Sequence, residues 1–170
     1  MHHKTLLTIM LLGLALIAMP ASVMAATPPS LVGSWQFTLT PTTPTPPTIA
    51  IPALATFTSD GTMIETDGSE LAPKPAPSSG ATPTYSSPGH GIWQLGPSMT
   101  FFYVQYYSIV ANQNGTLNSS ADTTMTVTLD STGTIFSGNF VTSYLSPSGK
   151  VIRTVSGMAS GTQIPHPLLP

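Results

Sequence analysis

The sequence predicts an all-β domain, an up-and-down antiparallel barrel of about eight strands. Three observations predict it. Apolar residues alternate with Thr, Ser, Gln and Asn in short segments, which is the period of a half-buried strand. After the first residues, no long segment repeats its apolar positions with the helical period. Most segments are separated by three or four turn-forming residues, which favours a meander over a two-sheet sandwich.

Residues 1–25 are predicted to be a cleaved signal peptide. A weakly basic start precedes the apolar run from Leu6 to Met19, and Pro20 to Ala25 supplies the small residues that a signal peptidase recognises. The run is shorter than the roughly 20 residues of a membrane-spanning helix. We therefore expect an exported protein, periplasmic or extracellular, whose mature chain is one domain over 26–170 with a tail at 165–170.

The composition argues against several classes of function. Charged residues make up only 6% of the chain, and acidic residues outnumber Lys and Arg by six to four, so no basic surface for nucleic acid is expected. The absence of cysteine excludes a disulfide framework. Two histidines in the mature chain and scattered acids form no ligand cluster, so we expect neither a metal nor a cofactor.

The expected strands follow from the alternation, in chain order. Trp35 to Thr40 places Trp35, Phe37 and Leu39 on one face. The later expected strands are Thr48–Thr58, Thr62–Thr66, His90–Leu95, Met99–Ala111, Asp122–Asp130, Thr134–Leu145 and Lys150–Gly157. Met158–Ile164 either extends the last of these with a kink or forms a separate closing strand. Closing such a meander removes its exposed edges.

One connection, residues 67–89, is too long for a purely structural loop. It is rich in Pro, Ser and Gly and exceeds the 12 to 15 residues that such loops rarely pass. It is either a flap over one mouth of the barrel or an insertion without a task.

A short motif and a single arginine carry a resemblance to a known family. Gly33-Ser34-Trp35 at the first strand and Arg153, the single arginine, in a late strand resemble the lipocalin and wider calycin pattern. The resemblance implies that Gly33 and Trp35 close one end of the barrel and that Arg153 packs across the indole. The segments 89–93 and 161–164 also resemble small exported bacterial lipocalin-like barrels, many of which have no assigned activity.

Aromatic residues are the candidate ligand-binding groups. On the strand expected at 99–111, Phe101, Tyr103 and Tyr107 share one face with Gln105, and Phe102, Val104 and Tyr106 share the other. The alternation leaves open which face points inward. We name Trp93, Phe101, Tyr103 and Tyr107 as candidate ligand-binding residues, with plain core packing as the alternative.

Two residues are candidates for catalysis. His90, at the expected barrel mouth, is suited to a general base because histidine titrates near neutral pH. Glu65 shares a strand face with Asp67, and both are expected at a solvated strand end. No nucleophile elbow or phosphate-binding loop accompanies them, so the residues favour a binding protein over an enzyme.

Three functions remain open at this point. The first is a secreted or periplasmic barrel that binds a small, mostly apolar ligand in its lumen. The second is a cyclase or isomerase on the same barrel, using His90 and lumen tyrosines. The third is a structural surface protein or outer-membrane barrel without a ligand, for which membrane insertion is the less favoured form. A lumen of a few hundred Å³ would support the first two, and a filled lumen would contradict both.

Overall fold

The computed structural model describes residues 29–43, 49–68 and 84–165. The predicted signal peptide, the middle of the 67–89 connection and nearly all of the tail lie outside these residues. The described chain folds into nine strands: β1 (Gly33–Thr43), β2 (Ile51–Phe57), β3 (Thr62–Asp67), β4 (Thr84–Ser86), β5 (Gly89–Leu95), β6 (Phe101–Asn112), β7 (Leu117–Leu129), β8 (Ile135–Leu145) and β9 (Val151–Gln163). No helix in these ranges is long and apolar enough to cross a membrane.

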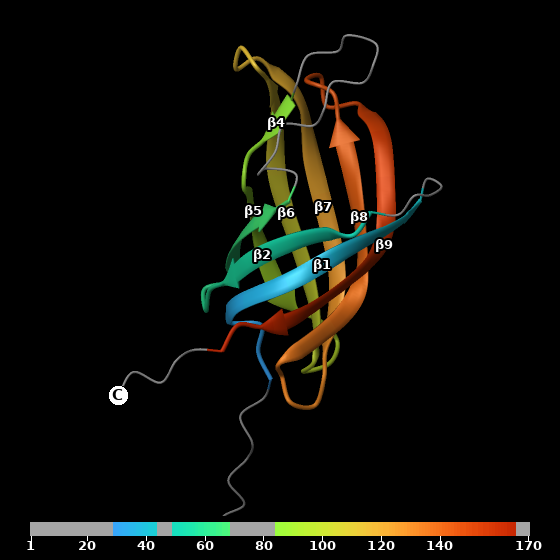
Figure 1. Ribbon diagram of the computed structural model, residues 1–170. Coiled ribbons are helices and arrows are strands. Elements are labelled where there is room, and N and C mark those ends of the chain that lie inside the picture. Colours follow the sequence, from blue (N-terminus) through green and yellow to red (C-terminus); the bar gives the residue numbers. More distant parts are fainter. Residues whose placement is uncertain (1–28, 44–48, 69–83, 166–170) are drawn as a thin grey trace, which may run out of the picture.

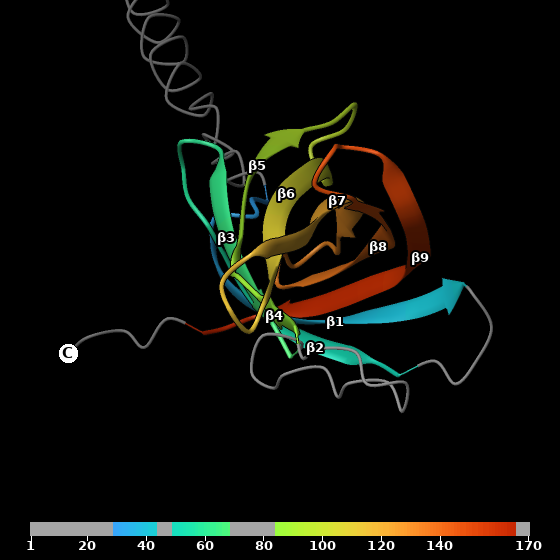
Figure 2. The same cartoon turned by 90° about the horizontal axis from the view of Figure 1, so that it is seen from above.

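The strands form one closed antiparallel sheet (Figures 1 and 2). Its order is β4-β6-β5-β3-β2-β1-β9-β8-β7, and β6 also pairs with β7, which closes the barrel. The short β4 and the longer β5 pair with successive parts of β6, so together they occupy one strand position. Nine strands therefore fill eight positions, and the predicted up-and-down barrel is confirmed.

The structure extends β1 to Thr43 rather than Thr40, and it decides or changes three further boundaries. β9 runs without interruption from Val151 to Gln163, so no separate closing strand exists in this part of the chain. β4 lies within the connection expected at 67–89, which is therefore not wholly a loop. β7 begins at Leu117 rather than at Asp122, because the turn-like segment 117–121 pairs with β6. Long neighbouring strands outweigh the weak strand propensity of Asn and Ser.

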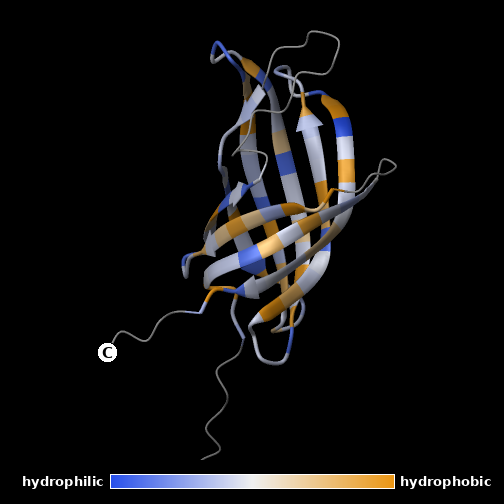
Figure 3. Ribbon diagram, in the orientation of Figure 1, coloured by the Kyte–Doolittle hydropathy of each residue, from blue (hydrophilic) through white to orange (hydrophobic). Residues whose placement is uncertain are grey.

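The apolar face of every long strand points into the barrel. Figure 3 shows the alternation of apolar and polar residues along the strands. On β6 the inward residues are Phe102, Val104 and Tyr106, all at most 5% exposed, whereas Tyr103 and Tyr107 point outward. The outer face consists mainly of Thr, Ser, Gln and Asn with single apolar residues among them. The barrel therefore has an apolar core and a nearly uncharged polar outside.

One end of the barrel is closed by residues before and at the start of β1. Leu31 and Trp35 are fully buried, and the indole Nε1 of Trp35 donates a hydrogen bond of 2.8 Å to the carbonyl oxygen of Leu31. The Trp35 ring also packs against Phe136, with ring centroids 5.3 Å apart. Gly33 adopts φ +130°, and a Cβ there would lie 2.8 Å from the side-chain nitrogen of Gln163. We call this the closed end.

The stack of Arg153 on Trp35 that the family resemblance implied is wrong. Trp35 pairs with Gln163 across the β1–β9 ladder, whereas Arg153 pairs with Tyr144. Arg153 and Gln163 are ten positions apart on one strand, which separates them by about 33 Å along its length. The Arg153 guanidinium instead lies 5.7 Å from the centroid of the Tyr144 ring. This is the end of the barrel opposite the closed end, and we call it the open end. Gln163 takes the place near the closed end, where its Nε2 donates to the carbonyl oxygen of Val32.

Gly91 and Gly138 lie where neighbouring backbones approach closely in the wall formed by β5 to β8. A Cβ at Gly138 on β8 would overlap the carbonyl oxygen of Thr126 on β7. A Cβ at Gly91 on β5 would likewise overlap the carbonyl oxygen of Gln105 on β6. Glycine in a barrel strand commonly occurs where the sheet turns a tight corner and another backbone comes close. Each of the two glycines is next in sequence to a residue that lines the outer groove described below.

Candidate functional site

The open half of the lumen holds a small pocket of about 50 Å³. Its apolar lining includes Leu39, Ile51, Val110, Phe140 and Val155. Its polar lining includes Glu65, Asp67, Tyr106, Thr123, Thr142 and Tyr144. Pockets that hold drug-sized molecules have volumes of about 300–1,000 Å³. This luminal pocket is therefore far smaller than the cavity expected for a barrel that encloses its ligand.

The ionisable groups of this luminal pocket influence one another. Burial raises the pKa of Tyr106 well above 10.0, and the nearby charge of Glu65 raises it further, while a hydrogen bond with Thr123 acts in the opposite direction. Burial also raises the pKa of Tyr144, against the lowering effect of Arg153. Both phenols are therefore protonated at neutral pH and act as hydrogen-bonding groups rather than as charges.

The two catalytic candidates lie on opposite sides of the barrel wall. Glu65 points into the lumen and is only 2% exposed, so its expected place at a solvated strand end is wrong. His90 is exposed on the outer face of β5. The register pairs Ile64 with His90 and Glu65 with Gly89, which places the two side chains on opposite faces of the sheet. His90 and the luminal tyrosines, Tyr106 and Tyr144, therefore do not form one site.

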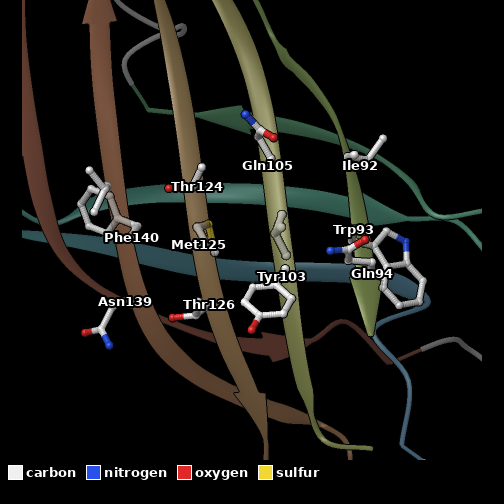
Figure 4. A pocket seen from close by; sticks show the side chains of 12 residues that line it. Ile92, Trp93, Gln94, Tyr103, Gln105, Thr124, Met125, Thr126, Asn139 and Phe140 are labelled. Carbon is white, nitrogen blue, oxygen red and sulfur yellow. The ribbon is translucent and has the colours of Figure 1, made fainter. Parts of the chain in front are cut away.

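A larger hollow lies on the outside of the barrel wall, across β5, β6, β7 and β8 (Figure 4). Its volume is about 440 Å³, and we call it the outer groove. The outward side chains that line it are Ile92, Gln94, Tyr103, Gln105, Thr124, Thr126, Asn139 and Val141. Trp93, Val104, Met125 and Phe140, which alternate with them along the strands, also border it. None of these side chains is charged.

The strand register arranges the outward side chains in two rows across the groove. Gln94, Tyr103, Thr126 and Asn139 are successive cross-strand partners and form one row. Ile92, Gln105, Thr124 and Val141 form the other by the same register. In the first row, Tyr103 therefore lies between Gln94 and Thr126, with Asn139 beyond Thr126 (Figure 4). The second row has an aliphatic residue at each end.

The candidate ligand-binding residues divide between the two faces of the wall. Tyr103 and Trp93 line the outer groove, although the Trp93 indole itself packs against Phe102 in the core. Phe101 lies beside the Tyr103 ring, and Tyr107 is on the outer face away from the groove. None of the three outward residues is a lumen residue, and the lumen tyrosines are Tyr106 and Tyr144 instead.

Five polar residues of the groove were not predicted from the sequence: Gln94, Gln105, Thr124, Thr126 and Asn139. Their signal in the sequence is only that they fall on the polar phase of alternating strands. That phase is shared by most of the outer face, so pattern alone does not separate groove residues from ordinary solvated ones. The cross-strand register brings these five residues together, and no single strand reveals that register.

The described residues contain no group of three or more His, Asp or Glu side chains that could hold a metal ion. Comparison of the chain with models of protein families, with characterised proteins and with solved structures finds no match. The class of the molecule is therefore defined by its fold, a closed eight-stranded antiparallel barrel with an apolar core.

Proposed function

We propose that this protein is an exported, lipocalin-like barrel that binds a small, uncharged, mostly apolar ligand. The proposal places the ligand in the outer groove rather than in the lumen. The observation that carries it is the difference in size: about 440 Å³ for the groove against about 50 Å³ for the luminal pocket. Of these two hollows, the groove is the one that falls within the range of small-molecule sites.

The chemistry of the groove supports the same ligand class. Ile92, Val141 and the Tyr103 ring offer apolar contact, and Gln94, Thr126 and Asn139 offer a few hydrogen-bonding groups. Such a lining orients a mostly apolar molecule that carries a few oxygens. The proposal includes no nucleic acid partner, and because the apolar faces of the strands point inward it includes no insertion into a membrane.

Export is part of the proposal and rests on residues 1–25. The basic start, the apolar run and the small residues up to Ala25 support processing by a signal peptidase. Mass spectrometry of the secreted or periplasmic protein tests it, with a mature N-terminus at Ala26 as the expected result. A chain that retains residues 1–25 in the cytoplasmic fraction would contradict export.

The binding test uses an environment-sensitive, uncharged apolar dye and the purified mature protein. Native mass spectrometry of the same preparation reports any lipophile that is bound when the protein is isolated. Thr126→Trp, which fills the groove from its outer face, is expected to abolish dye binding. Tyr144→Phe, which removes one hydroxyl from the luminal pocket, is the matched control and should leave dye binding unchanged.

A structural barrel without a ligand is the competing function, because the half of the lumen around Trp35 is packed with buried aromatic rings. It predicts that neither the dye nor any co-purifying lipophile binds. Loss of dye binding in Tyr144→Phe but not in Thr126→Trp would instead move the site into the lumen.

A further inference from the structure

Tyr103, in the outer groove, is held in place by a residue outside it. The Phe101 ring meets the Tyr103 ring edge to face, with centroids 5.2 Å apart and an angle of 79° between the planes. Tyr103 is still 43% exposed, so the contact restricts the ring without covering it. A ring that is already restrained loses little conformational freedom when a ligand stacks on it.

Gln105 is oriented in the same way. Its Nε2 donates a hydrogen bond of 3.0 Å to Oδ1 of Asp122, which is not part of the groove lining. Because an amide has its nitrogen and oxygen on opposite sides, this bond turns the carbonyl oxygen of Gln105 away from Asp122. An amide held in this orientation offers the ligand an acceptor, and a hydroxyl group is the complementary donor.

The charges around the groove restrict the ligand further. The twelve lining residues carry no ionisable acid or base other than the Tyr103 phenol, so a charged ligand would lose its hydration without gaining a counter-ion. The nearest acid that contacts the lining, Asp122, would repel an anion in particular. The site therefore selects uncharged molecules and disfavours anions most.

From these three features we infer that the ligand of the outer groove is an uncharged, flat ring that carries a hydroxyl group. The ring stacks on Tyr103, and the hydroxyl group donates to Gln105. Phe101 and Asp122 act as positioning residues, because they touch Tyr103 and Gln105 and not the ligand. The inference rests on the proposed function, since it names the ligand class of that groove. A phenolic aromatic and a sugar ring share this chemistry.

Four probes separate the requirements: 2-naphthol, naphthalene without the hydroxyl group, 2-naphthoate as the anionic analogue and a methyl glucoside as the sugar. Binding is measured by chemical shifts of the backbone amides of β5 to β8. We expect 2-naphthol or the glucoside to bind, and the one that binds shows whether the ligand is a phenolic aromatic or a sugar. We expect 2-naphthoate to bind at least tenfold more weakly than 2-naphthol. Equal affinity for 2-naphthol and 2-naphthoate would overturn the inference.

The stacking role of Tyr103 has a closely matched control on the same strand. Tyr103 and Tyr107 lie on the same outer face of β6 and are equally exposed at 43%, but only Tyr103 lines the groove. Tyr103→Ala is expected to weaken ring binding about tenfold, Tyr103→Phe to retain it, and Tyr107→Ala to leave it unchanged. Equal losses in Tyr103→Ala and Tyr107→Ala would remove the stacking role.

The positioning role of Asp122 has a readout that general destabilisation would not mimic. Asp122→Ala frees the Gln105 amide to rotate, so 2-naphthol should bind several-fold more weakly while naphthalene is unaffected. If Asp122→Ala weakened the binding of 2-naphthol and of naphthalene by the same factor, Asp122 would act only by stabilising the fold. Asp122→Asn, which keeps a hydrogen-bond acceptor for Gln105, should restore the preference for 2-naphthol.

A last comparison separates this inference from the proposed function. 1-Decanol is uncharged and mostly apolar but has no ring. If 1-decanol binds in the groove as tightly as 2-naphthol, the ring requirement fails and the proposed function stands. If none of the probes shifts the amides of β5 to β8, both fail.

Discussion

Polar side chains inside this barrel occur beside one another at the open end. Thr123 and Thr142 share a hydroxyl hydrogen bond of 2.8 Å between β7 and β8, and both are buried. Tyr106 lies beside Glu65 and bonds to Thr123. A buried polar group costs little when it is hydrogen-bonded. The buried side chains at the closed end are instead apolar, among them Leu31 and the rings of Trp35, Phe37 and Phe136.

The raised pKa of Tyr106 predicts a loss of stability at alkaline pH. In the unfolded chain this phenol ionises near 10.0, whereas in the barrel its pKa lies well above that value. The stabilising contribution is therefore fully present below pH 10 and is lost as the pH rises toward the folded pKa. Urea unfolding between pH 8 and pH 11 measures it.

Tyr106→Phe removes the ionisable group, so its stability should fall less steeply with pH over this range. The variant Met158→Ala, on the outer face and 59% exposed, should keep the wild-type slope. An identical slope in Tyr106→Phe and the wild type would contradict the prediction.

The buried indole of Trp35 predicts a large single-residue effect on stability. Trp35→Ala removes a fully buried ring, its contact with Phe136 and its hydrogen bond to Leu31. We expect a loss of about 3–5 kcal/mol in the free energy of unfolding. Urea denaturation checks it, with Met158→Ala as a control that should change stability by less than about 0.5 kcal/mol. If Trp35→Ala hardly changed the free energy of unfolding, the buried position of the Trp35 indole would be contradicted.

At the scale of the elements, the wall of β4 to β6 shows how an interrupted strand still closes a barrel. β4 and β5 leave a gap at Ser87 and Pro88. Ser87 bridges it, because its backbone N–H donates to the carbonyl oxygen of Ile109 and its Oγ accepts from the Ile109 N–H. The backbone N–H and carbonyl groups of Ile109 on β6 are therefore hydrogen-bonded even though neither β4 nor β5 pairs with this residue.

The close approach of the β7 backbone to Gly138 predicts that even a small substitution at Gly138 will lower the stability of the protein. In Gly138→Ala the new methyl group would overlap the backbone of β7 at Thr126, so β7 and β8 must move apart. We expect a cost of about 1–3 kcal/mol, as for other overpacked sites. Thermal unfolding measures it, and Gly68→Ala is the control because a Cβ there would meet Pro52 at an ordinary 3.4 Å. If Gly138→Ala and Gly68→Ala lowered the melting temperature equally, the requirement for glycine at position 138 would be contradicted.

At the scale of the whole molecule, the barrel is completed by strands from the two ends of the described chain. β1 and β9 pair antiparallel, and the Ile164 N–H donates to the carbonyl oxygen of Ser34 at 2.8 Å. The start of β1 and the end of β9 therefore lie side by side at the closed end (Figure 1). Such neighbouring ends can be joined by a short turn without moving either strand.

This arrangement predicts that a circular permutant will fold. Joining Ile164 to Leu31 by a short Gly/Ser linker and opening the chain in the turn at 113–116 keeps every strand pairing. We expect a cooperative melt and the same β-sheet circular dichroism as the wild type. Opening the chain inside β7, which pairs with both β6 and β8, should abolish the cooperative transition. A permutant at 113–116 that fails to fold would contradict the β1–β9 pairing.

The strands were predictable where residues alternate strictly, and not where they do not. Trp35 to Leu39 alternate strictly between apolar and polar residues, and they lie in β1. The segment 117–121 and the short β4 do not show that pattern and form strands only because β6 supplies hydrogen-bonding partners. The expected site was incomplete for a related reason. The aromatic side chain of Tyr103 could be recognised from the sequence as a candidate binding group. Gln105, Thr126 and Asn139 become candidates only because the strand register places them near Tyr103.

By itself, the sequence determined the all-β class, the meander and the low charge of the outer face, because alternation and turn residues are local properties of the chain. Only the tertiary structure decided which face of β6 is inside, how little room the lumen has and where Arg153 lies. Those depend on register, which pairs Trp35 with Gln163 and Arg153 with Tyr144. Register arises from contacts between distant strands, and a shift of one residue would exchange the two faces of a strand.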